Sequence, residues 1–269
     1  MPTPADEDRR QLHRGLKDLQ RQQTECSNRI KGLLASQGLD VAVDAEFRTR
    51  LDALRDWAGQ PVPAGLRERV LQEFAVWEAL HGQVRDAANE QERQLREGKG
   101  PFLDLVRRLM GLKAVGVRGA WVLAAELFAW RDVKNGRELG ALVGLTPTPY
   151  DSGQSAREQG ISKAGNKHVR GLIVELAWLW LRWQPGSALS QWYERRFGCG
   201  NKRARKVGIV ALARKLLIAL WRYLGRGEWP EGAGGRTGAC GSIRRRGGTP
   251  RPRRRRPETG GARPPRATS

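Results

Sequence analysis

The feature that most constrains this chain is a heptad-like apolar seam in its first forty residues. Its apolar members recur at alternating steps of four and three, with one polar interruption at Gln23: Leu12, Leu16, Leu19, Cys26, Ile30 and Leu33. This spacing places them along one stripe of a helix and is typical of a coiled coil. Because so narrow a stripe needs a partner, we expect the helix to pack on another helix of the chain or on a second subunit.

Two further helical patterns follow. A short one, containing Phe47 and Trp57, is interrupted by Pro61 and Pro63. A longer one runs from about residue 66 to residue 95, and its stripe consists of Val70, Trp77, Leu80, Val84 and Ala87. We therefore predict a helical coiled-coil arm over residues 1–99, either folded as an antiparallel hairpin or paired with a second subunit.

A glycine-rich turn lies between two apolar helical segments after this arm. An apolar helix is predicted from residue 102 to 110, and a second one follows the turn. The arrangement resembles the helix-hairpin-helix element, in which the backbone of a glycine turn contacts a DNA phosphate. Gly116, Arg118 and Gly119 would then lie at the phosphate. Val115 stands where the usual pattern has its first glycine, and a purely structural turn explains the glycines equally well.

The rest of the chain also shows helical periodicity up to about residue 224. One helix is predicted to begin near Asn166, capped by Asn166 or Ser162, and a last one carries apolar residues from Ile209 to Tyr223. We find no convincing alternation of apolar and polar residues that would indicate a strand. The fold class is therefore predicted to be all-α, with a small helical domain over residues 100–227.

The formal net charge of +21 favours a polyanionic partner such as DNA or RNA. From residue 232 onward eleven arginines stand against one acid, Glu258, in a stretch rich in Gly and Pro. We expect residues 228–269 to form a disordered basic tail, because they contain too few apolar residues to bury. The simplest interpretation is a basic extension that binds nucleic acid weakly; a dedicated binding arm and a read-through beyond the original stop are the alternatives.

Other classes of site have little support in the sequence. Three widely spaced cysteines and three histidines show no metal-ligand or disulfide pattern, so we expect no metal site and a reducing compartment. The most apolar run, residues 172–181, is too short to span a bilayer and contains Glu175. These features favour a cytoplasmic protein with no membrane partner and no cofactor of its own.

The stretch from residue 150 to 170 gathers serines, glycines and cations between two apolar segments. Ser152 precedes a glycine, and a serine that attacks a phosphodiester needs cations and helix N–H donors to stabilise the developing charge. From these residues alone, a solvated loop with serine caps is the simpler interpretation. No general base is evident, because His168 is close to Ser152 only in sequence.

A more specific pattern runs through the same stretch: GLTPTPYDSGQS, then GISKAGN, then Arg170 and a helix containing AW. It resembles the C-terminal domain of a family of bacterial insertion-sequence transposases, and the resemblance covers roughly residues 12–224. In that family a RuvC-like N-terminal domain binds magnesium through four acidic residues and a coiled coil mediates assembly. The C-terminal domain supplies a serine nucleophile, and a bridge RNA pairs with the DNA.

Carried onto this chain, the resemblance implies that Ser152 is the nucleophile, with Ser155 as the alternative. It implies further contacts to the nucleic-acid backbone from Arg157, Ser162, Lys163, Asn166, Lys167 and Arg170. DNA and a structured guide RNA would be the partners, and the coiled coil would form a homo-oligomer.

The pattern departs from the family at both ends of the chain. No stretch with four spaced carboxylates precedes the coiled coil, so we expect a truncated copy, with any magnesium belonging to the missing domain. The expected function is that of a DNA transposase acting through a serine. The alternatives are a non-catalytic, nucleic-acid-binding, oligomerising remnant and, with less support, a helical scaffold.

Overall fold

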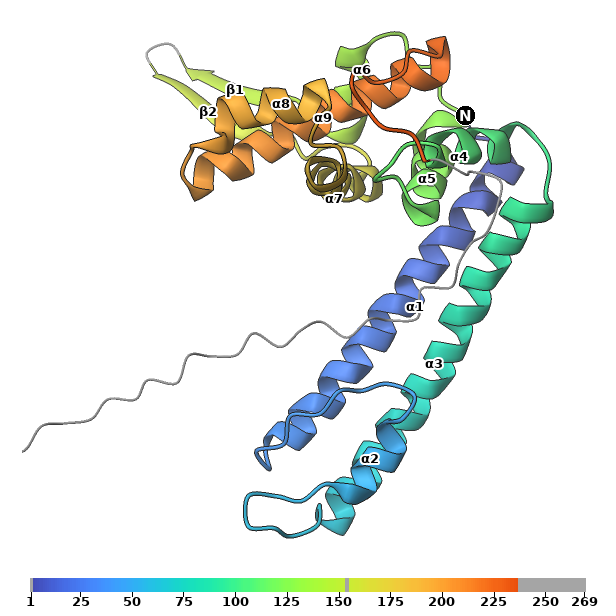
Figure 1. Cartoon of the computed structure of the whole chain (residues 1–269), viewed down its shortest axis with the longest axis vertical. Coiled ribbons are helices and arrows are strands. Elements are labelled where there is room, and N and C mark those ends of the chain that lie inside the picture. The colour runs from blue at the N-terminus through green and yellow to red at the C-terminus, as the bar shows by residue number, and fades with distance from the viewer. Residues whose placement is uncertain (1, 153–154, 237–269) are drawn as a thin grey trace, which may run out of the picture. The chain divides into compact units, whose positions relative to one another are not determined.

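The computed structural model describes residues 2–152 and 155–236, and for residues 149–159 it describes the backbone alone (Figure 1). The elements in chain order are α1 (Pro4–Ala35), α2 (Phe47–Ala53), α3 (Ala64–Glu97), α4 (Pro101–Met110), α5 (Val117–Leu123), the π-helix η1 (Ala124–Phe128), α6 (Gly136–Val143), β1 (Pro147–Ser152), β2 (Ser155–Ile161), α7 (Lys167–Trp183), α8 (Ala188–Tyr193), the π-helix η2 (Glu194–Gly198) and α9 (Lys202–Arg226). The predicted helical class is confirmed, with one two-stranded sheet added to it. No helix in the described part is long and apolar enough to cross a membrane.

Helices α1 and α3 lie side by side as the long arm in Figure 1, and their contacts run in opposite directions along the chain. Gln23 of α1 meets His81 of α3, whereas Arg29, further along α1, meets Glu73, earlier in α3. The arm has its own core, formed by Cys26, Ile30, Leu34, Phe47, Leu51, Val62, Val70, Phe74 and Trp77. The expected antiparallel hairpin within one chain is therefore confirmed.

The seam of α1 shifts by one residue near the end of the helix. Leu34 is fully buried, whereas the predicted seam residue Leu33 is only partly buried. An ideal helix turns once every 3.6 residues, so a stripe spaced at 3.5 drifts around it by about 20° per heptad.

The helices from α4 to α9 enclose a second core, whose largest fully buried side chains are Trp121, Trp180 and Tyr193. Within this group α7 packs on α9, and α5 packs on α7. At the crossing of α5 and α7, Gly119 is buried where a Cβ would lie 3.4 Å from Leu176 Cδ2. The small residue lets the two helices approach closely.

Strands β1 and β2 form an antiparallel hairpin within the segment that we expected to be a loop. Ser152 pairs with Ser155 at the last position of the ladder, and the register is irregular between Pro147 and Pro149. The sequence concealed this hairpin, because its first strand contains two prolines and neither strand alternates apolar with polar residues.

The predicted start of the basic tail at residue 228 needs correction. Residues 228–236 follow α9 back to the turn between α4 and α5, where the Arg236 N–H donates to Gly111 O over 2.8 Å. The Trp229 ring packs edge-on against Tyr223, with 5.1 Å between the ring centroids. These contacts hold the segment against α4 and α9, although the Trp229 side chain is 44% exposed. Residues 237–269 lie outside the described residues.

Candidate functional site

The turn at residues 162–166, which joins β2 to α7, is tied to the end of α6. The Ser162 N–H donates to Thr146 O over 2.9 Å, and the Asn166 N–H donates to Leu142 O over 3.0 Å. These bonds connect both ends of the turn to the segment that leads into β1. The base of the hairpin is therefore closed by backbone hydrogen bonds on each side.

Two glycines of the sequence pattern make this closure possible. Gly144, after α6, has φ +72°, and Gly165, in the turn, has φ +105°, a region that favours glycine. A Cβ on Gly144 would collide with Ala164 O, and a Cβ on Gly165 would collide with Leu142 O. Each glycine thus faces the backbone of the opposite segment, and no larger residue fits at either position.

Asn166 caps the helix that follows the turn. Its Oδ1 accepts hydrogen bonds from the N–H groups of His168 (2.9 Å) and Val169 (3.1 Å) at the start of α7. Its Nδ2 donates to Glu126 Oε2 over 2.8 Å. The predicted cap at Asn166 is therefore confirmed, and the side chain uses both ends of its amide inside the protein.

Glu126 is a carboxylate with only 1% of its surface exposed, in the π-helix η1. Arg14 of α1 donates from Nε to Oε1 over 2.8 Å and from Nη2 to Oε2 over 3.0 Å. His13 Nε2 lies 3.0 Å from Oε1, an ion-pair distance at which the two groups are not aligned as a hydrogen bond. One carboxylate therefore contacts side chains from both the arm and the base of the hairpin.

The surroundings of Glu126 keep it ionised. Burial alone would raise its pKa, but contacts from His13, Arg14 and Asn166 outweigh burial and hold the pKa well below the ordinary value. Glu126 is not among the site residues predicted from the sequence. A signal was present, because Glu126 is the only charged residue in the apolar run from Ala120 to Trp130.

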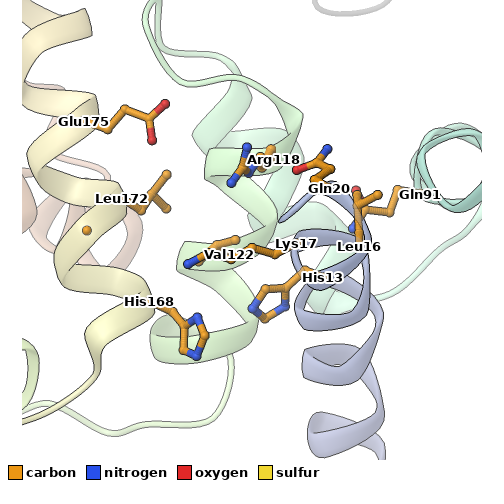
Figure 2. A pocket seen from close by; sticks show the side chains of 11 residues that line it. His13, Leu16, Lys17, Gln20, Gln91, Arg118, Val122, His168, Leu172 and Glu175 are labelled. Carbon is orange, nitrogen blue, oxygen red and sulfur yellow. The ribbon is translucent and has the colours of Figure 1, made fainter. Parts of the chain in front are cut away.

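A cavity of about 280 Å³ lies between α1, α5 and α7 (Figure 2). It is lined by His13, Leu16, Lys17, Gln20, Gln91, Arg118, Val122, His168, Gly171, Leu172 and Glu175. The rings of His13 and His168 lie edge to face, with 6.4 Å between their centroids. Within the described part of the chain, Nδ1 of each ring has no hydrogen-bond partner. Both of these nitrogens are buried.

His168 tends to remain uncharged in this setting. Burial lowers its pKa first, and the cationic side chains of Lys17 and Arg14 lower it further, while Glu126 acts in the opposite direction. Figure 2 shows the His168 ring on the side of α7 that faces α1. This residue is therefore part of the junction between the arm and α7.

The side chains of Ser152, Ser155 and Arg157 lie outside the described residues, so their predicted roles stay predictions. The described backbone places Ser152 opposite Ser155 in the ladder. Directly opposed residues of an antiparallel pair have Cα atoms about 5 Å apart. The two candidate nucleophiles are therefore neighbours across the hairpin.

The other predicted contact residues are divided between the surface and the interior. Lys163 and Lys167 are exposed, and Lys163 has φ +55° at the base of the hairpin. Ser162 Oγ lies 3.5 Å from Thr146 Oγ1. Arg170 is partly buried, and its Nη1 donates to Val143 O (3.2 Å) and Lys163 O (2.7 Å), which strengthens the base of the hairpin.

The predicted phosphate-binding turn consists of the segment between α4 and α5. Gly116 immediately precedes α5 with φ −88°, a value that any residue can adopt. Arg118 is exposed and lines the cavity, whereas Gly119 is buried between helices. The structure therefore gives Gly119 a packing role, and phosphate contact by Gly116 and Arg118 stays a prediction.

Comparison with known proteins gives a consistent result. Residues 106–194 match the Transposase IS116/IS110/IS902 family. The chain is 41% identical over 243 residues to the putative transposase y4rJ of Sinorhizobium fredii, an alignment that covers 87% of this chain and 61% of that protein. It is 26% identical to a probable family 20 transposase of Pseudomonas aeruginosa, covering 80% of this chain and 62% of that protein. It is also 26% identical to the transposase for insertion sequence element IS1328 of Yersinia enterocolitica, covering 81% and 64%. The chain thus spans about three fifths of the length of these relatives.

Proposed function

We propose that this chain, which carries the Transposase IS116/IS110/IS902 family domain in residues 106–194, acts in the DNA strand cleavage and rejoining of an insertion sequence. The observation that carries the proposal is the match of this segment to transposases, because the segment includes the whole hairpin and its base. The nucleophile in this proposal is Ser152, with Ser155 as the alternative.

The proposed reaction is a phosphoryl transfer through the serine hydroxyl. The serine Oγ forms a bond to the phosphorus of a DNA phosphodiester while the bond from phosphorus to the leaving deoxyribose oxygen breaks. The hydroxyl proton passes to solvent or a base, and the leaving oxygen takes up a proton. The phosphoserine ester conserves the bond energy, so attack by a second DNA hydroxyl can rejoin the strand and release the serine.

The surroundings of the hairpin base are suited to an anionic substrate. Lys163 and Lys167 are exposed there, and neither lies within ion-pair distance of a carboxylate in the described part of the chain. The close backbone contacts at Gly144 and Gly165 fix the backbone from which both strands extend. A fixed base supports catalysis, because a nucleophile must be held close to its reacting geometry.

The family resemblance also suggests a structured guide RNA as partner, and the arm as the site of homo-oligomerisation. Magnesium, in this proposal, is held outside this chain. Among the described residues, no group of three or more His, Cys, Asp and Glu side chains is arranged to hold a metal ion. All the steps assigned here to this chain use its own side chains.

The test is a search for a covalent protein–DNA adduct. The chain is incubated with labelled element-junction DNA, with and without element RNA, and the products are separated under denaturing conditions. We expect an adduct that Ser152→Ala abolishes and that Ser36→Ala, a change at the end of α1, leaves intact. Adducts that persist in both Ser152→Ala and Ser155→Ala would overturn the serine role. Duplex binding without any adduct would favour the non-catalytic, nucleic-acid-binding alternative.

A further inference from the structure

A second concentration of cations lies around η2 and the first turns of α9. Its members are Arg195, Arg196, Lys202, Arg203, Arg205 and Lys206, which we call the α9 basic surface. All six are exposed, and none lies within 4.0 Å of a carboxylate oxygen in the described part of the chain. The segment from residue 194 to 206 contains one acid, Glu194.

Most arginines of the arm are paired with acids. Exposed examples are Arg9 with Asp6, Arg29 with Glu73, Arg48 with Glu78, Arg67 with Asp52 and Arg93 with Glu90. Among the described residues of the arm, the exposed Arg55 and Arg96 lie in no ion pair. Basic residues that serve only solubility can have their charge neutralised by neighbouring acids, as in these ion pairs. The α9 basic surface is different, because its charges are left without balancing acids.

The position of these charges is unfavourable for the free protein. The first turn of α9 contains no acidic residue, and Lys202, Arg203 and Arg205 lie beside the positive end of the helix dipole. A cation at this end of a helix is destabilising, whereas an anion there is favourable. A bound polyanion would convert this repulsion into attraction.

The backbone that carries these cations is held in place by packing. The Phe197 ring of η2 lies over Gly208 of α9, where a Cβ would collide with the ring. Phe197 also packs against Tyr193, with 5.9 Å between ring centroids, and Asn201 caps α9 by accepting from the Ala204 N–H over 2.9 Å. The segment that carries the two arginines is therefore packed against the helix that carries the other four cations.

We propose that the α9 basic surface binds the phosphate backbone of nucleic acid, through cations distinct from those of the hairpin base and of the C-terminal tail. Its assignment to nucleic acid rests on the proposed function. A protein partner is less suitable, because the centre of a protein interface is apolar. Among the described residues of η2 and the first turns of α9, Val207 is the one large hydrophobic residue that is strongly exposed. A membrane surface is also less suitable, since α9 buries its apolar face, including Leu212 and Leu216, inside the protein.

The test measures how binding of a labelled 30-base-pair duplex of arbitrary sequence depends on salt. The first variant carries Arg195→Gln, Arg196→Gln, Arg203→Gln and Lys206→Gln in the full chain. The control variant carries Arg85→Gln, Arg93→Gln, Arg96→Gln and Lys99→Gln, which removes the same charge from the arm. Circular dichroism and thermal melting establish that both variants fold.

If the four cations contact phosphates, the slope of log K against log salt should become shallower by about 3.6, at roughly 0.9 per phosphate contact. The affinity near physiological salt should fall at least tenfold in the first variant, and the control should change the slope by less than about 1. Equal slopes in the two variants would overturn the proposal. Displacement of the duplex by poly-glutamate as effectively as by unlabelled DNA would overturn the assignment to nucleic acid.

The salt dependence of duplex binding is independent of catalysis by the hairpin. A Ser152→Ala variant should keep the wild-type salt slope, because its change removes no charge. Failure of the serine mechanism would therefore appear as a missing covalent adduct with an intact salt slope. Failure of the α9 proposal would appear as an unchanged slope in the fourfold variant, whether or not adducts form.

Discussion

Asn166 and Glu126 are joined by a hydrogen bond of 2.8 Å from Nδ2 to Oε2, and this bond connects the hairpin base to the arm. On one side, Asn166 caps α7 and donates its backbone N–H to the end of α6. On the other side, Glu126 accepts two hydrogen bonds from Arg14 of α1. Two side chains thus link the segment that carries the candidate nucleophiles to the helix that begins the arm.

Replacing Glu126 by glutamine should destabilise the protein by about 2 kcal/mol, because hydrogen bonds to a charged group are lost. The loss should be smaller than for a fully buried pair, since the Arg14 side chain is 31% exposed and can be partly solvated. Urea unfolding of Glu126→Gln measures the effect. Glu175→Gln, at an exposed residue of α7, is the control and should change stability by at most about 0.5 kcal/mol. Equal effects of the two changes would contradict the proposed link.

Substitutions of Asn166 should separate its two functions. Asn166→Ser keeps a capping oxygen but loses the bond to Glu126, whereas Asn166→Ala loses both, so alanine should cost about 1 kcal/mol more than serine. Asn166→Asp keeps the cap but places a second carboxylate beside Glu126, and at neutral pH it should be less stable than Asn166→Ser. Thermal unfolding of the three variants gives this order. Equal melting temperatures for the unchanged protein and Asn166→Ser would show that the hydrogen bond to Glu126 contributes nothing.

Alanine at Gly144 or Gly165 should be severely destabilising, because a Cβ at either site collides with a backbone carbonyl. Gly160 provides a matched control, since it also has positive φ (+84°) but has open space around its Cα. Gly160→Ala should therefore cost only the conformational penalty of about 1 kcal/mol. Melting temperatures and soluble yield report the difference. A Gly165→Ala protein as stable as the Gly160→Ala protein would show that the close backbone contact at Gly165 is not needed for stability.

The stability of the protein should depend on pH through His168. Its pKa in the folded state is lowered, first by burial and then by neighbouring cations. The unfolded state therefore binds more protons as the pH falls through the ordinary value of about 6.5, so the protein loses stability. We expect His168→Gln to reduce the drop in melting temperature between pH 7.5 and pH 5.5.

His81 is the control for this prediction, because it is exposed on α3 and Gln23 is its hydrogen-bonding partner. His81→Gln should leave the pH dependence close to that of the unchanged protein. Glu126 does not add to the slope in this range, since its pKa lies well below the ordinary value and it stays ionised. The same pH dependence in His168→Gln and His81→Gln would disprove the role assigned to His168.

The sequence pattern was sufficient for the features that depend on neighbours along the chain. The seam of α1 and the stripe of α3 predicted the two helices, because an apolar stripe has to be buried, but left open whether they pair with each other or with a second subunit. Asn166 was predicted as a cap because asparagine can bind the free N–H groups at the start of a helix. The GISKAGN pattern likewise indicated the segment that the family match includes.

Only the tertiary structure decided which distant groups meet. Arg14 and Glu126 are 112 residues apart, and no local pattern pairs them. The hairpin from Pro147 to Ile161 is held by contacts at its base, where Gly144 and Gly165 each face the backbone of the opposite segment. These contacts join residues that are distant in sequence. For that reason the local strand propensity did not predict the hairpin. The sequence by itself determined the helices and the excess of positive charge. The fold decided which charges are paired and which stay exposed, because Coulomb energies depend on distances in space and not along the chain.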